Sequence, residues 1–192
     1  MTKGRLEAFS DGVLAIIITI MVLELKVPHG SDLGALAPVI PVLLGYVVSF
    51  VYVGIYWNNH HHLLHATHRV SAGVMWANLH LLFWLSLVPF VTGWVGEHPD
   101  APWPAALYGV ILLMAGVAWL FLVRAILAQH EPGSELAELV KDDRKAKLST
   151  VLYLVAVGAA FLRPWVAQAL YAIVALLWIV PDRRIEAKLS AE

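Results

Sequence analysis

The sequence predicts an all-α integral membrane protein with six transmembrane helices and both termini on the cytoplasmic side. Of its 192 residues, 60% are hydrophobic and only 14% are charged, and the mean hydropathy is +0.74. A soluble domain carries about 25% charged residues, and one small core cannot bury this much apolar side chain. Composition therefore excludes a water-soluble enzyme. The number of helices follows from polar breaks that divide the chain into apolar runs.

Each apolar run ends at a charged residue or a turn former. The first stops at Pro28, the second is entered through Pro38 and Pro41, and the last two are separated by Arg163 and Pro164. A membrane span needs about 20 residues, so the last two runs are short, and one re-entrant hairpin is the alternative for them. Residues 1–192 are expected to form a single six-helix domain, with spans at about 6–27, 35–57, 70–95, 103–128, 148–162 and 165–180.

The basic residues set the orientation. With a cytoplasmic N-terminus, 11 of the 13 lysines and arginines fall on the cytoplasmic side. Only Lys26 and Arg163 remain outside, which is a strong positive-inside asymmetry. The cytoplasmic set is Lys3, Arg5, Arg69, Arg124, Lys141, Arg144, Lys145, Lys147, Arg183, Arg184 and Lys188.

Several functional classes lack support. The net charge of −1 does not favour nucleic acid, and the absence of cysteine removes thiolate metal sites. The sequence contains no T-V-G-Y-G filter, P-loop, G-x-S-x-G or G-x-G-x-x-G motif. No catalytic residue and no cofactor are therefore predicted.

Polar residues near the start of the first helix need partners within the membrane. Asp11 lies six residues past Arg5, about 9 Å deeper at 1.5 Å per residue. Ser10 and Asp11 are expected to join a buried network with Asn78 and His80 of the third helix, or with a histidine of the second. The favoured interpretation is a clamp between helices, and the alternative is a proton or cation site at Asp11.

Ile16, Thr19 and Leu23 share one face of the first helix, at i, i+3 and i+7. Such a narrow face suits a seam between helices. If several copies surround an axis, the same face lines a pore with an apolar constriction and one hydroxyl layer. Ordinary packing, with Thr19 bonded to its own helix, is the alternative.

A histidine-rich cluster follows the second apolar run. If that helix continues, His61, His65 and His68 lie on one face at i, i+4 and i+7. A packing role, pH sensing and a zinc or copper site all fit this pattern. The H-E-x-x-H acid is missing, so no metal site is firmly predicted.

The segment Arg5–Ile16 resembles the first-helix R-x-x-x-F-S-D motif of the transmembrane protein 175 family, the lysosomal and prokaryotic potassium channels. Residues 56–61 (YWNNHH) and 82–90 (LFWLSLVPF) resemble prokaryotic members as well. The likeness is clear over the first three helices, and the remainder agrees in length and hydropathy.

This resemblance implies a potassium-preferring cation channel without a conventional filter loop, whose pore is lined by the first helix of each subunit. A single-repeat chain is then a homotetramer in a prokaryotic cell membrane, in contact with lipid, potassium and other monovalent cations. By the same resemblance, Ile16 forms the constriction, with Thr19 and Leu23 further along the pore. The motif residues Arg5, Phe9, Ser10 and Asp11 hold the first helix against the second and third.

Two other functions remain open at this stage. One is a proton-coupled secondary transporter that uses Asp11, His80 and the other membrane histidines as a relay. The second is a membrane metalloprotein that binds zinc through His61 and His65. The largely aliphatic first helix favours the channel.

Overall fold

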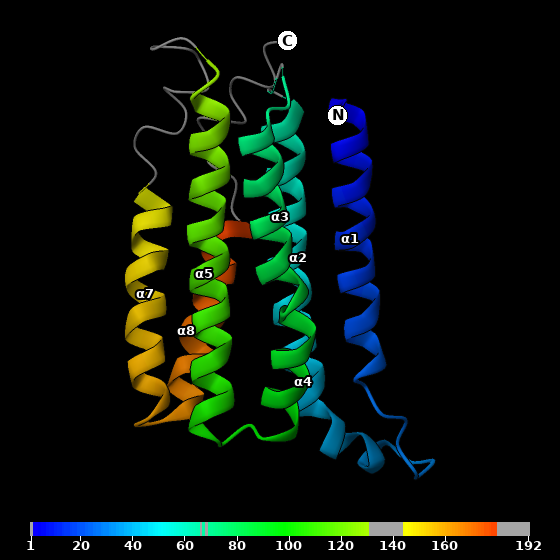
Figure 1. Cartoon of the computed structure of the whole chain (residues 1–192). Helices are drawn as coiled ribbons and strands as arrows, with labels where there is room; N and C mark the ends of the chain where they lie inside the picture. Colours follow the sequence, from blue (N-terminus) through cyan, green and yellow to red (C-terminus); the bar gives the residue numbers. More distant parts are fainter. Residues whose placement is uncertain (1, 66, 68, 131–143, 180–192) are drawn as a thin grey trace.

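The computed structural model describes residues 2–65, 67, 69–130 and 144–179. These residues form a helical bundle whose long helices run roughly parallel or antiparallel to one another (Figure 1). The elements are α1 (Lys3–Leu23), the 3₁₀ helix η1 (Leu33–Val39), α2 (Ile40–His65), α3 (Ala72–Ser86), α4 (Val88–Glu97), α5 (Pro102–Leu127), α7 (Arg144–Ala160) and α8 (Pro164–Ile179). The all-α class is confirmed.

We name the two ends of the bundle after Lys3 and Lys26, which lie near them. At the Lys3 end, α1, α3 and α7 begin, while α2 and α5 finish (Figure 1). The Lys26 end lies opposite, where α1 and α4 finish and η1, α5 and α8 begin. Four stretches are long and apolar enough to cross a membrane: Lys3–Leu23, Leu33–His65, Ala72–Glu97 and Pro102–Leu127. The count of six spans and their orientation stay predictions.

The expected third span is interrupted. Pro89 has no N–H with which to donate to the carbonyl of Leu85, so the helical ladder fails at that point. The chain instead makes a tighter, 3₁₀-type turn, in which the Leu87 amide donates to the carbonyl of Trp84, three residues earlier, at 3.3 Å. It therefore divides into α3 and α4 at Leu87, where sequence analysis expected one continuous run.

The second helix is longer than expected. Its 3₁₀ entry contains Pro38, and the α-helix then continues to His65 instead of ending near Trp57. The histidine-rich segment is consequently helical as far as the structure describes it. Residues 131–143, between the expected spans 103–128 and 148–162, lie outside the described residues.

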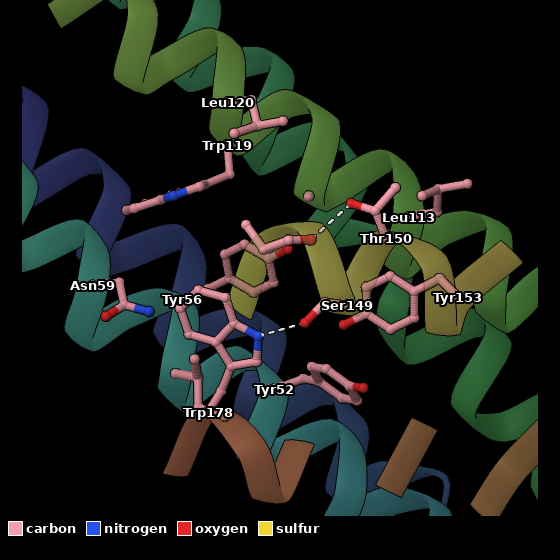
Figure 2. A pocket seen from close by; sticks show the side chains of 13 residues that line it. Tyr52, Tyr56, Asn59, Leu113, Trp119, Leu120, Ser149, Thr150, Tyr153 and Trp178 are labelled. Atoms are coloured by element: carbon pink, nitrogen blue, oxygen red, sulfur yellow. Dashed lines mark hydrogen bonds between the residues drawn. The ribbon is translucent and has the colours of Figure 1, made fainter. Parts of the chain in front are cut away.

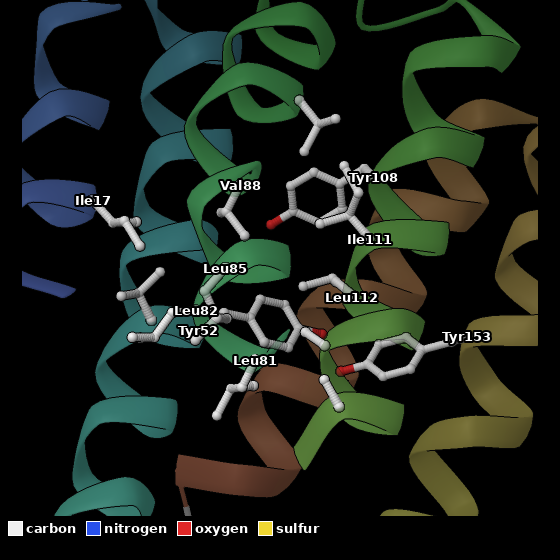
Figure 3. Close-up of a cluster of buried hydrophobic side chains, with 14 of the residues drawn as sticks. Ile17, Tyr52, Leu81, Leu82, Leu85, Val88, Tyr108, Ile111, Leu112 and Tyr153 are labelled. Carbon is white, nitrogen blue, oxygen red and sulfur yellow. The ribbon is translucent and has the colours of Figure 1, made fainter. Parts of the chain in front are cut away.

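The core joins all the long helices. Leucine and valine side chains from α3 and α4 meet α1 on one side and α5 on the other, as Figure 3 shows around Ile17, Leu85 and Ile111. Tyr52 and Tyr153 bring α2 and α7 into the same cluster. α1 packs against α2, α3 and α4, whereas α7 and α8 pack on α5. The first helix thus lies at one edge of the bundle.

Candidate functional site

α1 has two faces with different environments. Leu6, Ser10, Leu14, Ile17 and Met21 are buried against the neighbouring helices. The opposite stripe stays uncovered, because Phe9, Ile16 and Leu23 are 48%, 57% and 78% exposed. These three lie seven residues apart, so they follow one line along the helix. The predicted face is therefore free of intrachain packing.

The hydroxyl group of Thr19 lies on the same exposed side. Its Oγ1 donates to the carbonyls of Ala15 and Ile16, each at 3.0 Å. This is the backbone bond that sequence analysis named as the packing alternative. Because a carbonyl can only accept, the hydroxyl proton is used and the oxygen keeps its lone pairs as acceptors.

Behind this face, a buried chain of polar groups joins three helices. The Ser10 hydroxyl of α1 donates to the Leu6 carbonyl at 2.8 Å, so toward Asn78 it can only accept. The Asn78 amide of α3 donates to Ser10 at 2.9 Å, which directs its Oδ1 at His60 Nε2, 2.6 Å away on α2. His60 therefore carries its proton on Nε2.

Asp11 has a different partner from the one predicted. Its Oδ1 accepts from the indole N–H of Trp57 on α2 at 3.0 Å. The Asp11 side chain is exposed in the single chain. A carboxylate that faced lipid there would be energetically costly. The bond to Trp57 also holds α1 against α2.

The other predicted members of the clamp lie apart from it. His80 accepts from the indole of Trp84 on its own helix at 2.9 Å, and its ring also meets Phe121 of α5. It is 20 residues along from His60 in sequence and does not reach Ser10 or Asp11 in the described contacts. Arg5 and Phe9 are exposed, so their predicted role in holding α1 stays a prediction.

The histidine cluster lies along the last turns of α2. The rings of His61 and His65 are 6.3 Å apart between centroids, and His61 stacks on Trp57 at 6.4 Å. His68 lies outside the described residues. Within the described ranges, no group of three or more histidine or acidic residues is arranged to hold a metal ion.

Both ends of α1 are attached to the bundle. The Lys3 ammonium donates to the His65 carbonyl at 2.6 Å. Beyond the other end, Lys26 pairs with Glu97 of α4 at 2.5 Å, and this carboxylate raises the pKa of Lys26 above its ordinary value. The Glu24 carboxyl lies on Gly93, where an added Cβ would come within 2.9 Å of Oε2. A larger residue at position 93 would displace it.

Sequence reasoning missed two partners. A histidine of the second helix was expected in the buried network without His60 being singled out, and Trp57 was not considered as a partner. The position of these residues along α2 could have identified them. Because α2 runs antiparallel to α1, its last turns lie beside the first turns of α1. A donor for Asp11 was therefore to be sought between Trp57 and His61.

Comparisons with known proteins identify the family. Residues 5–89 match the family model described as the endosomal/lysosomal potassium channel TMEM175. A protein of Chryseobacterium sp. (strain P1-3), named as a potassium channel, is 51% identical over 190 residues, which cover 99% of each chain. A chicken protein named as the endosomal/lysosomal proton channel TMEM175 is 43% identical over 75 residues, 33% of this chain and 15% of that one.

A solved structure also matches. The crystal structure of a lysosomal potassium-selective channel TMEM175 homolog from Chamaesiphon minutus superposes with a TM-score of 0.76 at 31% identity. The match covers 92% of this chain and 96% of the other. These relatives are channels, not enzymes. The resemblance carried by the first-helix motif is thereby confirmed, and the chain belongs to the TMEM175 family of integral membrane proteins.

Proposed function

We propose that this chain is the subunit of a potassium-preferring cation channel in a prokaryotic cell membrane. The bacterial relative named as a potassium channel supports this over nearly the whole chain, as does the homologous structure titled potassium-selective. The family resemblance adds a homotetramer with four-fold symmetry. No enzymatic step or cofactor is required, since permeation needs only a path and a gradient.

The conduction path of this proposal is the exposed face of α1. One observation carries it: Ile16, Thr19 and Leu23 remain uncovered, while the opposite face of the same helix is buried. If four such helices surrounded an axis, each would cover these residues of its neighbours, and Asp11 would not face lipid. The polar contacts of Ser10 and Asp11 would then support the wall of the pore from behind.

The mechanism follows from the chemistry of the three residues. A ring of Ile16 side chains closes a narrow pore by excluding water. Conduction then needs only a small widening of this ring. Thr19 offers oxygen lone pairs without a competing proton, because its hydroxyl donates to its own helix. These oxygens would replace part of the water that a potassium ion loses at the constriction.

Planar bilayers with potassium on one side and sodium on the other test the proposal. The parent protein is expected to give a current whose reversal potential favours potassium. Ile16→Asn should raise the leak, because a polar ring stays wet. Val22→Asn is the matched control, since Val22 is 45% exposed but lies about 120° around the helix from Ile16. Equal currents from Ile16→Asn and the parent would remove Ile16 as the gate.

The second candidate is proton movement, as a channel or as a proton-coupled transporter. The name of the chicken relative and the exposure of Asp11 favour it. Liposomes with an imposed pH gradient and no potassium gradient separate the two. Uptake that saturates, follows the pH gradient and is abolished by Asp11→Asn would favour the transporter over the potassium channel.

A further inference from the structure

A cavity of about 280 Å³ lies between α2, α4, α5 and α8, in the half of the bundle toward the Lys26 end. We call it the Gly45 cavity, after the α2 glycine in its wall. None of its lining residues belongs to α1. Leu44 marks its rim, being both part of the lining and 60% exposed. An apolar cavity of about 150 Å³ already takes up benzene, so this one has room for a ligand.

The polar groups in the wall have a fixed direction. The Thr92 hydroxyl lies 2.7 Å from the Val88 carbonyl, and because a carbonyl can only accept, Thr92 donates. Ser49, 2.6 Å from Thr92, must then donate to it, and Tyr108, 2.8 Å from Ser49, must donate in turn. The proton of Tyr108 is thus used within the protein, and its oxygen keeps free lone pairs.

The two remaining polar side chains of the wall, Tyr171 and Gln168, also donate within the protein. Tyr171 donates to the Ala105 carbonyl at 3.0 Å. The Gln168 amide donates from Nε2 to the Pro99 carbonyl at 2.7 Å, which leaves its Oε1 as an acceptor. Besides these groups the wall is aliphatic, and it contains no charged residue. The cavity is therefore apolar with oxygen acceptors whose protons are already committed.

From this chemistry we infer that the Gly45 cavity binds an apolar molecule that carries a hydroxyl group, taken up from the lipid phase. Such a molecule supplies the donor that Tyr108, Tyr171 and Gln168 lack, and its hydrocarbon part fills the aliphatic wall. An anion would find no positive charge there. An ether or an alkane of the same size would offer these oxygens no donor. The site does not depend on ion conduction.

A second cavity provides the control. The Gly116 cavity, of about 60 Å³, lies between α2, α5, α7 and α8, where the Trp178 indole donates to Ser149 at 2.9 Å (Figure 2). Each of the two cavities has a helical glycine in its wall with room for a side chain. An added Cβ would lie 3.8 Å from Thr92 at Gly45 and 3.9 Å from the Tyr56 hydroxyl at Gly116.

The experiment uses the full-length protein in lipid nanodiscs and two photolabels. One is decanol with a diazirine beside the hydroxyl, and the other is its methyl ether. The alcohol is expected to label peptides of α2 and α8 about fivefold more than the ether does, which is the discrimination of one net hydrogen bond. Gly45→Leu should abolish this labelling and Gly116→Leu should leave it. Tyr108→Phe keeps the ring, and it should reduce alcohol labelling toward the level of the ether.

Three results would overturn the inference. Equal labelling by alcohol and ether would remove the role of the acceptors. Labelling that survives Gly45→Leu would place the molecule elsewhere. No labelling by either probe in a protein that elutes normally would mean that the cavity is closed, for instance by a neighbouring subunit. If Gly45→Leu does not assemble, competition by unlabelled decanol, but not by its methyl ether, decides the question on the parent protein.

Discussion

The side-chain amide of Asn78 donates to the hydroxyl oxygen of Ser10 across the contact between α3 and α1, and both residues are fully buried. Since Asn78 also accepts from His60, one side chain satisfies a group on each of two other helices. A shared partner of this kind links the position of α1 to both α2 and α3. Its removal leaves His60 Nε2 without its acceptor and takes away the donor to the Ser10 oxygen, which keeps only its own bond to Leu6.

Ser10→Ala is therefore expected to lower the free energy of unfolding by about 1 kcal/mol, within the range for hydrogen bonds between membrane helices. Asn78→Ala should cost more, about 1–3 kcal/mol, since His60 also loses its acceptor. In the double variant the costs should not add. Denaturant unfolding in detergent measures all three. Ser86→Ala is the control, because the exposed Ser86 bonds only to its own helix, and a loss there as large as that of Ser10→Ala would contradict the prediction.

The lone pairs of Thr19 give a second prediction, which rests on the proposed pore. Thr19→Val keeps the shape of the side chain and removes the oxygen, so single-channel potassium conductance should fall about fivefold, the equivalent of ~1 kcal/mol. Thr19→Ser keeps the oxygen and should conduct nearly as the parent does. Single-channel recording in symmetric potassium makes the comparison. A fully conducting valine variant would show that the hydroxyl oxygens do not contact the ion.

Close helix packing at Gly109 gives a third prediction. An added Cβ there would meet the Tyr171 hydroxyl and come within 2.8 Å of Val157 Cγ2. Gly109→Ala should therefore destabilise the protein by about 1–3 kcal/mol, as overpacking does, and disturb the bond from Tyr171 to Ala105. Gly158→Ala has open space and should be neutral or stabilising by up to ~1 kcal/mol. Thermal unfolding of the pair is the test, and equal shifts would refute the packing argument.

The ion pair at the Lys26 end predicts a pH effect of defined sign. Hydrogen bonding and attraction by Glu97 raise the pKa of Lys26 from its ordinary value of 10.5. The stabilisation is complete below that value and is lost as the pH rises through the raised pKa. It should be small and reduced by salt, because the two side chains are 80% and 52% exposed.

Lys26→Arg keeps its charge in alkali and should not show this alkaline loss. The measurement is the unfolding temperature of parent and variant from neutral to strongly alkaline pH, at low and at high salt. An alkaline loss of the same size in both proteins would assign it to other groups.

Sequence reasoning succeeded where one local rule decides. The periodicity of Ile16, Thr19 and Leu23 placed them on one face, and in the structure all three are exposed. Sequence reasoning also anticipated the contact between Ser10 and Asn78, but it could not choose among several candidate residues on another helix. Nothing local distinguishes His60 from the other histidines of α2, His61, His62 and His65, and the choice depends on which one the rotation of α2 turns toward Asn78. The expected role of His80 in the network was wrong because of a local contact. Trp84 lies one turn away on the same helix and donates to His80.

The attachments of α1 also limit how it moves. Polar bonds hold it at Lys3, Ser10 and Asp11, and just beyond its last turn at Lys26. Between Asp11 and Glu24, about 20 Å of helix, the described contacts with other helices are apolar. Apolar surfaces slide past one another without breaking directional bonds, so this middle segment can bow or turn about its axis while its ends stay anchored. In the proposed four-fold assembly, an outward bow of this segment would widen the pore near Ile16 without breaking the polar bonds at either end of α1.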